Sequence, residues 1–180
     1  MNFFISSIKA EYLVKISYRD VRKLVDDEGD FERYLWIQRP ISTKRIGQIK
    51  NYITASDATF PTAVILAVDE KCAEFESSNG SELLGTLILK PFISDDSLDE
   101  SIPIERIAKV LDGQHRIAAF IDDKDNWCFP YDERTFDINI AIFIGLDVSE
   151  QANIFATVNL AQTKVNRRLV YDLTELAINQ

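Results

Sequence analysis

The sequence is poor in the side chains that bind transition metals or form disulfide bonds. Its 180 residues include one histidine, His115, and two cysteines, Cys72 and Cys128, which lie far apart. A structural zinc site needs four ligands at short spacing, and a disulfide-stabilised domain needs several paired cysteines. The composition therefore predicts neither, and it predicts two buried or free thiols in a reducing cytoplasm.

Long apolar runs and an excess of positive charge are also absent. No apolar run reaches the roughly 20 residues that span a membrane, and residues 1–10 lack the basic start and long apolar stretch of a signal peptide. We therefore expect a cytoplasmic protein with no membrane partner. The formal net charge of −9 excludes a surface that binds nucleic acid all over, because phosphate contacts need Lys and Arg.

The length and the apolar content of 46% suit one domain with a sizeable core. We expect a single domain over residues 1–180. The last predicted helix, Asn166 to Ile178, has no stop signal before Gln180. The chain is thus interpreted either as a short protein or as the N-terminal part of a longer one.

Hydrophobic periodicity predicts an α/β chain. Strand patterns occur at residues 2–9, 11–17, 63–68, 82–90, 107–111 and 136–146, and helix patterns at 19–25, 42–53, 114–121, 147–158 and 166–178. Turn residues at 77–80 predict that strands 63–68 and 82–90 form a hairpin. Strand 136–146 is expected to be central because it is the longest, and the acidic segment 94–101 is expected to be a solvated loop. The expected core positions near the N-terminus are Phe3, Ile5, Leu13 and Ile16.

Two helix starts carry capping signals. Ser42 is predicted to cap a helix that presents Ile46 and Ile49 on one face. Asp147 and Glu150 have the spacing of a capping box for the helix that follows the longest strand.

The most informative stretch is residues 110–120, where an apolar strand ends in a glycine turn and an amphipathic helix begins. Asp112 occupies the position of a helix N-cap, and Gly113 permits a close backbone approach that a side chain would prevent. The next three residues supply an amide, an imidazole and a guanidinium, namely Gln114, His115 and Arg116. Because the first N–H groups of a helix are unpaired and lie at its positive end, this turn is predicted to bind phosphate.

The same pattern also has a purely structural interpretation. Strand–turn–helix units with a capping Asp occur in most α/β proteins, and an arginine in a first helical turn is usually solvated. The chemistry of the residues leaves both interpretations open.

The string Asp112-Gly113-Gln114-His115-Arg116 resembles the signature of the DGQHR-domain family, whose members include DndB-type proteins of DNA phosphorothioation islands and relatives in other DNA-modification islands. Two further segments resemble family elements in order and spacing. They are Ile37 to Arg45, with an early Gln-Arg pair, and Ile154 to Val165, with the pattern Phe-x-x-Val-Asn-x-x-Gln. The resemblance covers about residues 12–176.

This resemblance implies a ParB/sulfiredoxin-like fold, a mixed sheet flanked by helices in the α/β (α+β) class, whose corresponding turn binds nucleotide phosphates. ATP or another NTP would be the cofactor, with Mg²⁺ as a companion ion. Asp112 would cap the helix or hold Mg²⁺, His115 would transfer a proton or donate to phosphate, and Arg116 would clamp phosphate oxygens. The remaining nucleotide contacts would come from Gln38, Arg39, Gly113, Gln114, Asn159 and Gln162.

Several of these residues have structural alternatives. Arg39 can instead pair with a surface carboxylate, and the carboxamides of Asn159 and Gln162 can hold the connection to the last helix. The basic trio that follows is the best local candidate for a DNA or triphosphate patch, and it consists of Lys164, Arg167 and Arg168.

This chain differs from sulfiredoxin and from ParB-type proteins, two relatives of the implied fold, by one feature each. Sulfiredoxin has a reactive cysteine where this chain has Gln114, so sulfinic-acid repair by that route is excluded. ParB-type proteins continue into a helix-turn-helix domain, for which this chain has no room.

The sequence thus predicts an NTP-binding and NTP-hydrolysing domain of a bacterial DNA-modification or anti-phage defence system, with DNA nicking as an activity of a full-length protein. The alternative is a non-enzymatic DNA-binding regulator of a DNA phosphorothioation operon. A third interpretation is an assembly module that binds neither ligand. Expected partners are nucleotide, DNA and other proteins of the modification system, and the sequence does not predict the oligomeric state.

Overall fold

The computed structural model describes residues 2–18, 42–80, 83–95, 99–122, 126–129 and 135–161. The strands are β1 (Asn2–Lys9), β2 (Ser17–Tyr18), β3 (Val64–Val68), β4 (Ala73–Ser77), β5 (Gly85–Leu89), β6 (Ala108–Asp112) and β7 (Asp137–Ile144). The α-helices are α1 (Ala10–Ile16), α3 (Thr43–Tyr52), α4 (Gln114–Ala118) and α5 (Val148–Ala161), and the 3₁₀ helices are η1 (Glu70–Cys72) and η2 (Ile104–Arg106).

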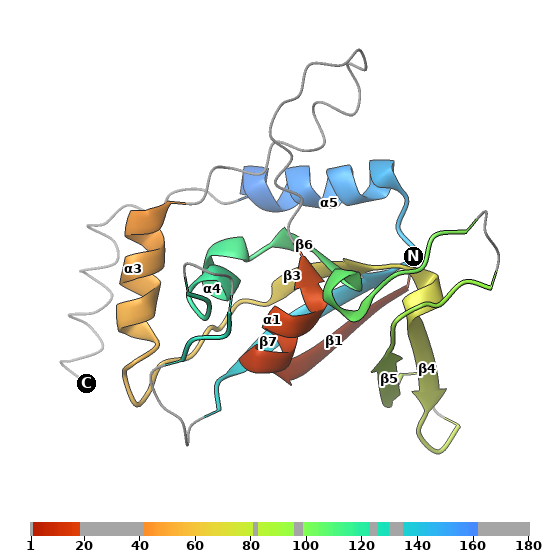
Figure 1. Ribbon diagram of the computed structural model, residues 1–180, viewed down its shortest axis with the longest axis horizontal. Coiled ribbons are helices and arrows are strands. Elements are labelled where there is room, and N and C mark those ends of the chain that lie inside the picture. The colour runs from red at the N-terminus through yellow and green to blue at the C-terminus, as the bar shows by residue number, and fades with distance from the viewer. Residues whose placement is uncertain are drawn as a thin grey trace, which may run out of the picture.

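Five strands form a mixed sheet in the order β1-β7-β3-β6-β2, and β4 and β5 form a separate two-stranded sheet (Figure 1). The predicted mixed sheet flanked by helices is thereby confirmed. Strand β3 occupies the centre, parallel to β7 and antiparallel to β6. Strand β7, which was expected to be central, is interior but lies one place from the middle, between β1 and β3.

The core lies on one face of this sheet. Alternate residues of the strands point into it, and they include Val64, Leu66, Val110, Ile138 and Ile140, which are almost fully buried. Phe120 is completely buried, and its ring lies 5.1 to 6.5 Å from four other rings, those of Phe60, Trp127, Phe129 and Phe136. This aromatic cluster fixes the chain that follows α4.

The expectation of a strand at residues 11–17 is wrong, because this segment is mostly helix α1. Its buried residues Ala10, Leu13 and Ile16 recur every three positions, which is a helical spacing. Leu13 and Ile16 are in the core as expected. Phe3 and Ile5 are not, because β1 directs them to the other face of the sheet, where their side chains remain 52% and 75% exposed.

The expected hairpin between strands 63–68 and 82–90 is also wrong. β5 pairs antiparallel with β4, which the sequence analysis did not predict. The turn chemistry itself is present, since Asn79 and Gly80 both have positive φ. The turn thus joins β4 to β5, and both edges of β3 are occupied by β6 and β7.

Other predicted features are partly or wholly outside the described residues. The expected helices at 19–25 and 166–178 lie outside them. In the described part of the acidic loop, Asp99 forms an exposed ion pair with Lys71 at 2.7 Å. None of the helices described here combines the length and apolar character that a membrane crossing requires.

Candidate functional site

The glycine turn between β6 and α4 differs from its predicted form. Asp112 was expected to cap the helix, but it is the last residue of β6, and the N-cap is Gly113, with φ 94° and ψ 11° and no side-chain capping bond. The backbone N–H groups of Arg116 and Ile117 donate to the Gly113 carbonyl at 2.9 and 3.3 Å. Because α4 has only 5 residues, few aligned peptides contribute to its dipole. Positive charge at this turn therefore comes from side chains.

Gly113 allows the turn to lie directly against strand β3. A Cβ atom at this position would lie 2.8 Å from Val64 Cγ2 and 3.3 Å from Val64 Cα. Both the left-handed conformation and this contact require glycine. The predicted close approach of the backbone is confirmed, and it is made to β3.

Arg116 joins α4 to the chain that enters β3. Its Nη1 atom donates to the carbonyl and the hydroxyl oxygen of Thr62, and its Nη2 atom donates to the Ala63 carbonyl at 3.1 Å and to Asp112 Oδ2 at 3.3 Å. Burial lowers the pKa of Arg116, and the nearby Asp112 carboxylate opposes that change. The guanidinium also lies over the Phe60 ring, 6.0 Å from its centroid. Arg116 thus holds the turn in place, with Asp112 as its counter-ion.

His115 joins the same turn to α3. Its Nε2 atom accepts a hydrogen bond from the backbone N–H of Ser42 at 3.1 Å, so the imidazole is neutral in this contact and carries its proton on Nδ1. The Ser42 hydroxyl oxygen accepts from the Arg45 N–H at 3.3 Å, which confirms the predicted cap of α3. One imidazole therefore positions the start of α3, and Arg45 with it.

A cavity of about 700 Å³ opens beside the DGQHR turn (residues 112–116). We call it the turn cavity. All residues of the turn line it, and the other lining residues come from α3, from α5, from the sheet and from the chain before β3: Arg45, Ile49, Phe60, Thr62, Ala63, Ile65, Leu111, Ala141, Phe155 and Val158. Arg45 and Arg116 both line this cavity, and the charge of Arg45 adds to the effect of burial in lowering the pKa of Arg116. Among the described lining residues there are thus two arginines and one carboxylate, that of Asp112, and the remainder of the wall is largely apolar.

Helix α5 covers the turn cavity, and its start is fixed by the predicted capping box. The Glu150 N–H donates to Asp147 Oδ1 at 2.8 Å, and the Asp147 N–H donates to Glu150 Oε2 at 3.0 Å. This start places Phe155 and Val158 on the side of α5 that faces the cavity.

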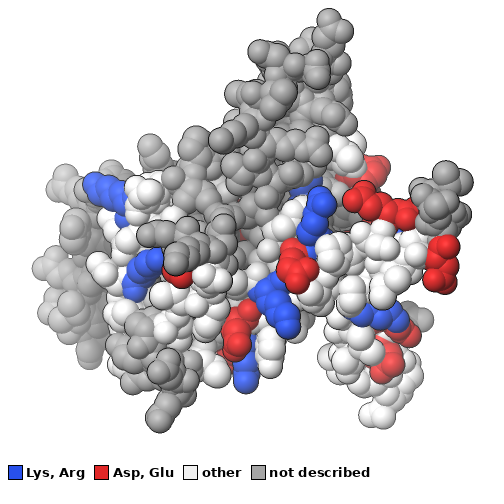
Figure 2. Space-filling view, viewed as in Figure 1, with Lys and Arg blue, Asp and Glu red and all other residues white. Residues whose placement is uncertain are grey.

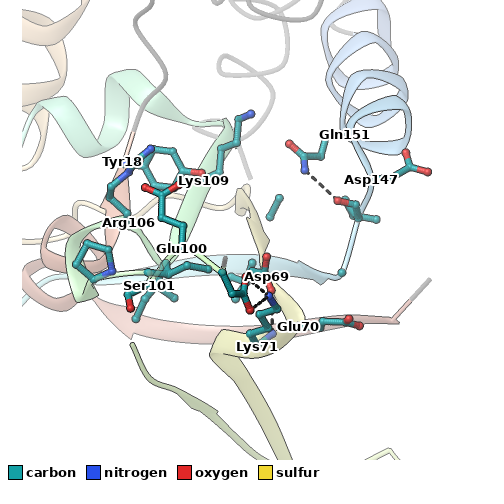
Figure 3. Close-up of a pocket in the computed structure, with 18 residues that line it drawn as sticks. Tyr18, Asp69, Glu70, Lys71, Glu100, Ser101, Arg106, Lys109, Asp147 and Gln151 are labelled. Carbon is teal, nitrogen blue, oxygen red and sulfur yellow. Dashed lines mark hydrogen bonds and ion pairs between the residues drawn. The ribbon is translucent and has the colours of Figure 1, made fainter. Parts of the chain in front are cut away.

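A second cavity, of about 560 Å³, lies at the opposite ends of β3 and β6 (Figure 3). We call it the far cavity. Its charged lining comprises five carboxylates and three cations, namely Asp69, Glu70, Asp99, Glu100 and Asp147 with Lys71, Arg106 and Lys109. Lys71 is paired with Asp99, and Arg106 lies over the Tyr18 ring at 5.5 Å. The described lining of the far cavity would thus repel an anionic ligand more strongly than that of the turn cavity, because it contains more negative charge.

The predicted site residues are partly brought together. Asp112, Gly113, Gln114, His115 and Arg116 line one cavity, and Asn159 lies in the last turn of α5, which covers that cavity. The others lie outside the described residues: Gln38, Arg39, Gln162, Lys164, Arg167 and Arg168. Within the described ranges, no three His, Cys, Asp or Glu side chains are grouped as a metal site.

Sequence reasoning missed the contribution of Arg45 and the cover provided by Phe155. A usable signal for Arg45 was present, because α3 contains basic residues and no acidic one in an otherwise acidic chain. Phe155 begins the Phe-x-x-Val-Asn-x-x-Gln pattern, but that pattern did not predict its cover of the cavity, because this depends on how α5 packs on the sheet.

Comparison with known proteins assigns the family. The sequence matches the DndB family, described as DNA-sulfur modification-associated, over residues 3–178. The chain belongs to the DndB family. No curated protein and no solved structure matches it. Membership in the DndB family indicates a role in DNA phosphorothioation modification systems, whereas the DGQHR-domain name and the ParB/sulfiredoxin-like relationship stay predictions.

Proposed function

We propose that this DndB-family chain binds a nucleotide, ATP or another NTP, in the turn cavity. The observation that carries the proposal is the composition of its wall, in which the whole DGQHR turn and Arg45 surround one hollow of about 700 Å³. Pockets for small ligands commonly measure about 300–1,000 Å³, and they combine an apolar wall with a few convergent polar groups. A nucleotide has the corresponding two parts, a flat base and a charged phosphate chain.

The two ends of the nucleotide would have different neighbours. Phosphates would lie toward Arg45, Gln114 and His115, whose side chains supply charge and hydrogen bonds. The base would lie between Phe155 and Ala141, on the apolar side of the cavity. In this proposal Arg116 shapes the cavity, because its hydrogen bonds to Thr62 and Ala63 already hold it.

Mg²⁺ fits this site only as a companion of the phosphates. Asp112 is the one carboxylate that the described residues contribute to the lining, and it is paired with Arg116. Mg²⁺ usually keeps several waters and uses one or two carboxylates together with substrate phosphates. NTP hydrolysis and DNA nicking remain further parts of the proposal, with Asp112 and His115 as the candidate groups.

The test is calorimetric titration of the purified protein with ATP, GTP and CTP, with and without Mg²⁺. We expect binding of at least one nucleotide, and a loss of about tenfold or more in affinity for Arg45→Ala, because a hydrogen bond to a charged group contributes about 1.5–3 kcal/mol. Lys44→Ala is the matched control, since Lys44 precedes Arg45 on α3 but does not line the cavity. No binding of any of the three, in either condition, would refute the proposal.

The second candidate is a DNA-binding regulator of a phosphorothioation operon. It is favoured by helix α3, which has Lys44, Arg45 and Lys50 and no acidic residue. In Figure 2 blue side chains lie toward α3 on the left, both colours occur in the centre, and red side chains are more numerous toward the right. Lys164, Arg167 and Arg168 stay candidates from the sequence.

This candidate predicts binding to a fragment of the operon's own promoter that weakens steeply with added salt. Lys44→Glu should weaken DNA binding at low salt and leave nucleotide affinity unchanged, whereas Arg45→Ala should affect both ligands. The triple change of Lys164, Arg167 and Arg168 to Glu tests the other patch. A protein that retains no promoter binding even at low salt would exclude the regulator.

A further inference from the structure

In the described part of the chain, strand β1 is an open edge of the main sheet. It ends the strand order of the main sheet, and no strand in the described ranges pairs with its other side. Its pairing with β7 runs without a shift from Asn2 opposite Ile144 to Lys9 opposite Asp137. Exposed edges are usually short, or they carry prolines, bulges or several charges. β1 has 8 residues, no proline, no bulge and one charge, at its last position.

The outward-facing side of β1 is apolar as well. Phe3 and Ile5 are 52% and 75% exposed, and Phe3 stacks on Phe143 of the neighbouring strand with ring centroids 5.3 Å apart. Ile5 lies opposite Ala141. An apolar strip thus extends across β7 and β1 to the open edge.

The sequence of β1 is complementary to itself in size. In an antiparallel pair of identical strands, a two-fold axis perpendicular to the sheet keeps like faces together and places one residue opposite its own copy. With Ile5 on that axis, Phe3 lies opposite Ser7 of the other copy, and Phe4 lies opposite Ser6. Both phenylalanines then face a serine, Ile5 meets its own copy, and the single charge of Lys9 does not meet its copy.

We infer that two copies of this chain associate through β1, antiparallel and with Ile5 at the two-fold axis. The two sheets of five strands then form one continuous sheet, and the exposed backbone groups of β1 are paired. Phe3 and Ile5 of both copies meet on the same side of that sheet. No β1 residue lines the turn cavity, so the dimer does not depend on the proposed nucleotide site.

The experiment measures the mass of the full chain by light scattering after gel filtration, over a range of concentrations. We expect the wild type at twice the mass of one chain. Ile5→Lys and Ile5→Glu should each give monomers, because two like charges meet at the axis, and an equimolar mixture of the two variants should restore the double mass. Ile93→Lys is the control, since Ile93 is 77% exposed and lies outside β1, and it should stay dimeric.

The Ile5 variants should fold, because a side chain that is mostly exposed in one copy contributes little to the stability of that copy. Circular dichroism should show the wild-type spectrum in both variants. A monomeric wild type would overturn the inference, and so would an Ile5→Lys variant that still dimerises. Failure of the mixture to restore the double mass would overturn the placement of Ile5 on the axis.

Discussion

The Nε2 atom of His115 accepts a hydrogen bond of 3.1 Å from the backbone N–H of Ser42, which lies 73 positions earlier in the chain. The contact connects the DGQHR turn to Ser42, the N-cap residue of α3. His115→Ala removes the acceptor, but water can reach the Ser42 N–H because the contact is exposed. We expect the free energy of unfolding, measured in urea, to fall by about 0.5–1 kcal/mol. Gln48→Ala, an exposed change on the same helix, should alter it less.

Even the conservative change Arg116→Lys should destabilise the protein. Lysine keeps the charge but cannot donate at once to Thr62, Ala63 and Asp112, as the guanidinium does. The Arg116 side chain is 14% exposed. Water can therefore only partly replace the hydrogen bonds that the carbonyls of Thr62 and Ala63 lose. Arg116→Lys should therefore lower the free energy of unfolding by about 2 kcal/mol.

A double-mutant cycle can measure the contribution of the Arg116–Asp112 pair to stability separately from the other hydrogen bonds of Arg116. Asp112→Asn combined with Arg116→Lys should cost less than the sum of the two single changes, by about 1 kcal/mol. Strict additivity would show that the pair contributes nothing of its own. Arg45→Lys, on the exposed side of the same cavity, should leave stability nearly unchanged.

Gly113 and Gly80 form a matched pair for measuring crowding at the turn. Both have positive φ, 94° and 73°, but an added Cβ meets Val64 at position 113 and nothing within 4 Å at position 80. Gly80→Ala should cost about 1–2 kcal/mol from the left-handed conformation alone. Gly113→Ala should cost roughly 1–3 kcal/mol more because of overpacking. Thermal unfolding of the two variants gives the comparison, and equal losses would contradict the close approach to β3.

The two thiols should react at very different rates. Cys128 is exposed, whereas Cys72 is buried, and burial raises the pKa of its thiol. The thiolate is the reactive form, so the raised pKa of Cys72 leaves it with less thiolate than an ordinary thiol has at mildly alkaline pH, and its burial limits the access of reagents. Iodoacetamide followed by peptide mass spectrometry should modify Cys128 in the native protein and Cys72 only after denaturation. Rapid native modification of Cys72 would contradict its place in the core.

Much of the sheet was predictable from sequence because its strands are strongly periodic or continuously apolar. β1, β3 and β7 fall within the expected segments, β6 extends one residue beyond its expected end to Asp112, and the caps of α3 and α5 were recognised from Ser42 and Asp147. Helix α1 was missed because Tyr12, Leu13 and Val14 form a continuous apolar run, which conceals the spacing of the buried positions. The partner of β5 was missed because pairing is set by the whole sheet and not by the turn.

In the candidate site, too, the local features were predictable from sequence and the tertiary contacts were not. Residues 112–116 are contiguous, so a local pattern was enough to find them. The sequence could not show that Asp112 pairs with Arg116 and leaves the N-cap to Gly113, since both roles suit an aspartate at that position. Arg45 and Phe155 join the turn only through tertiary packing, and no local pattern predicts that.

The charged residues around the two cavities, at opposite ends of β3 and β6, are unequally distributed along the strands in the described part of the chain. Arginines and lysines lie at the end with α3, and carboxylates predominate at the other. If the chain binds DNA as proposed, the field of that polyanion would favour encounters in which the α3 end of the described part leads. This orientation acts on the rate of encounter, and it fades as dissolved ions shorten the range of the field.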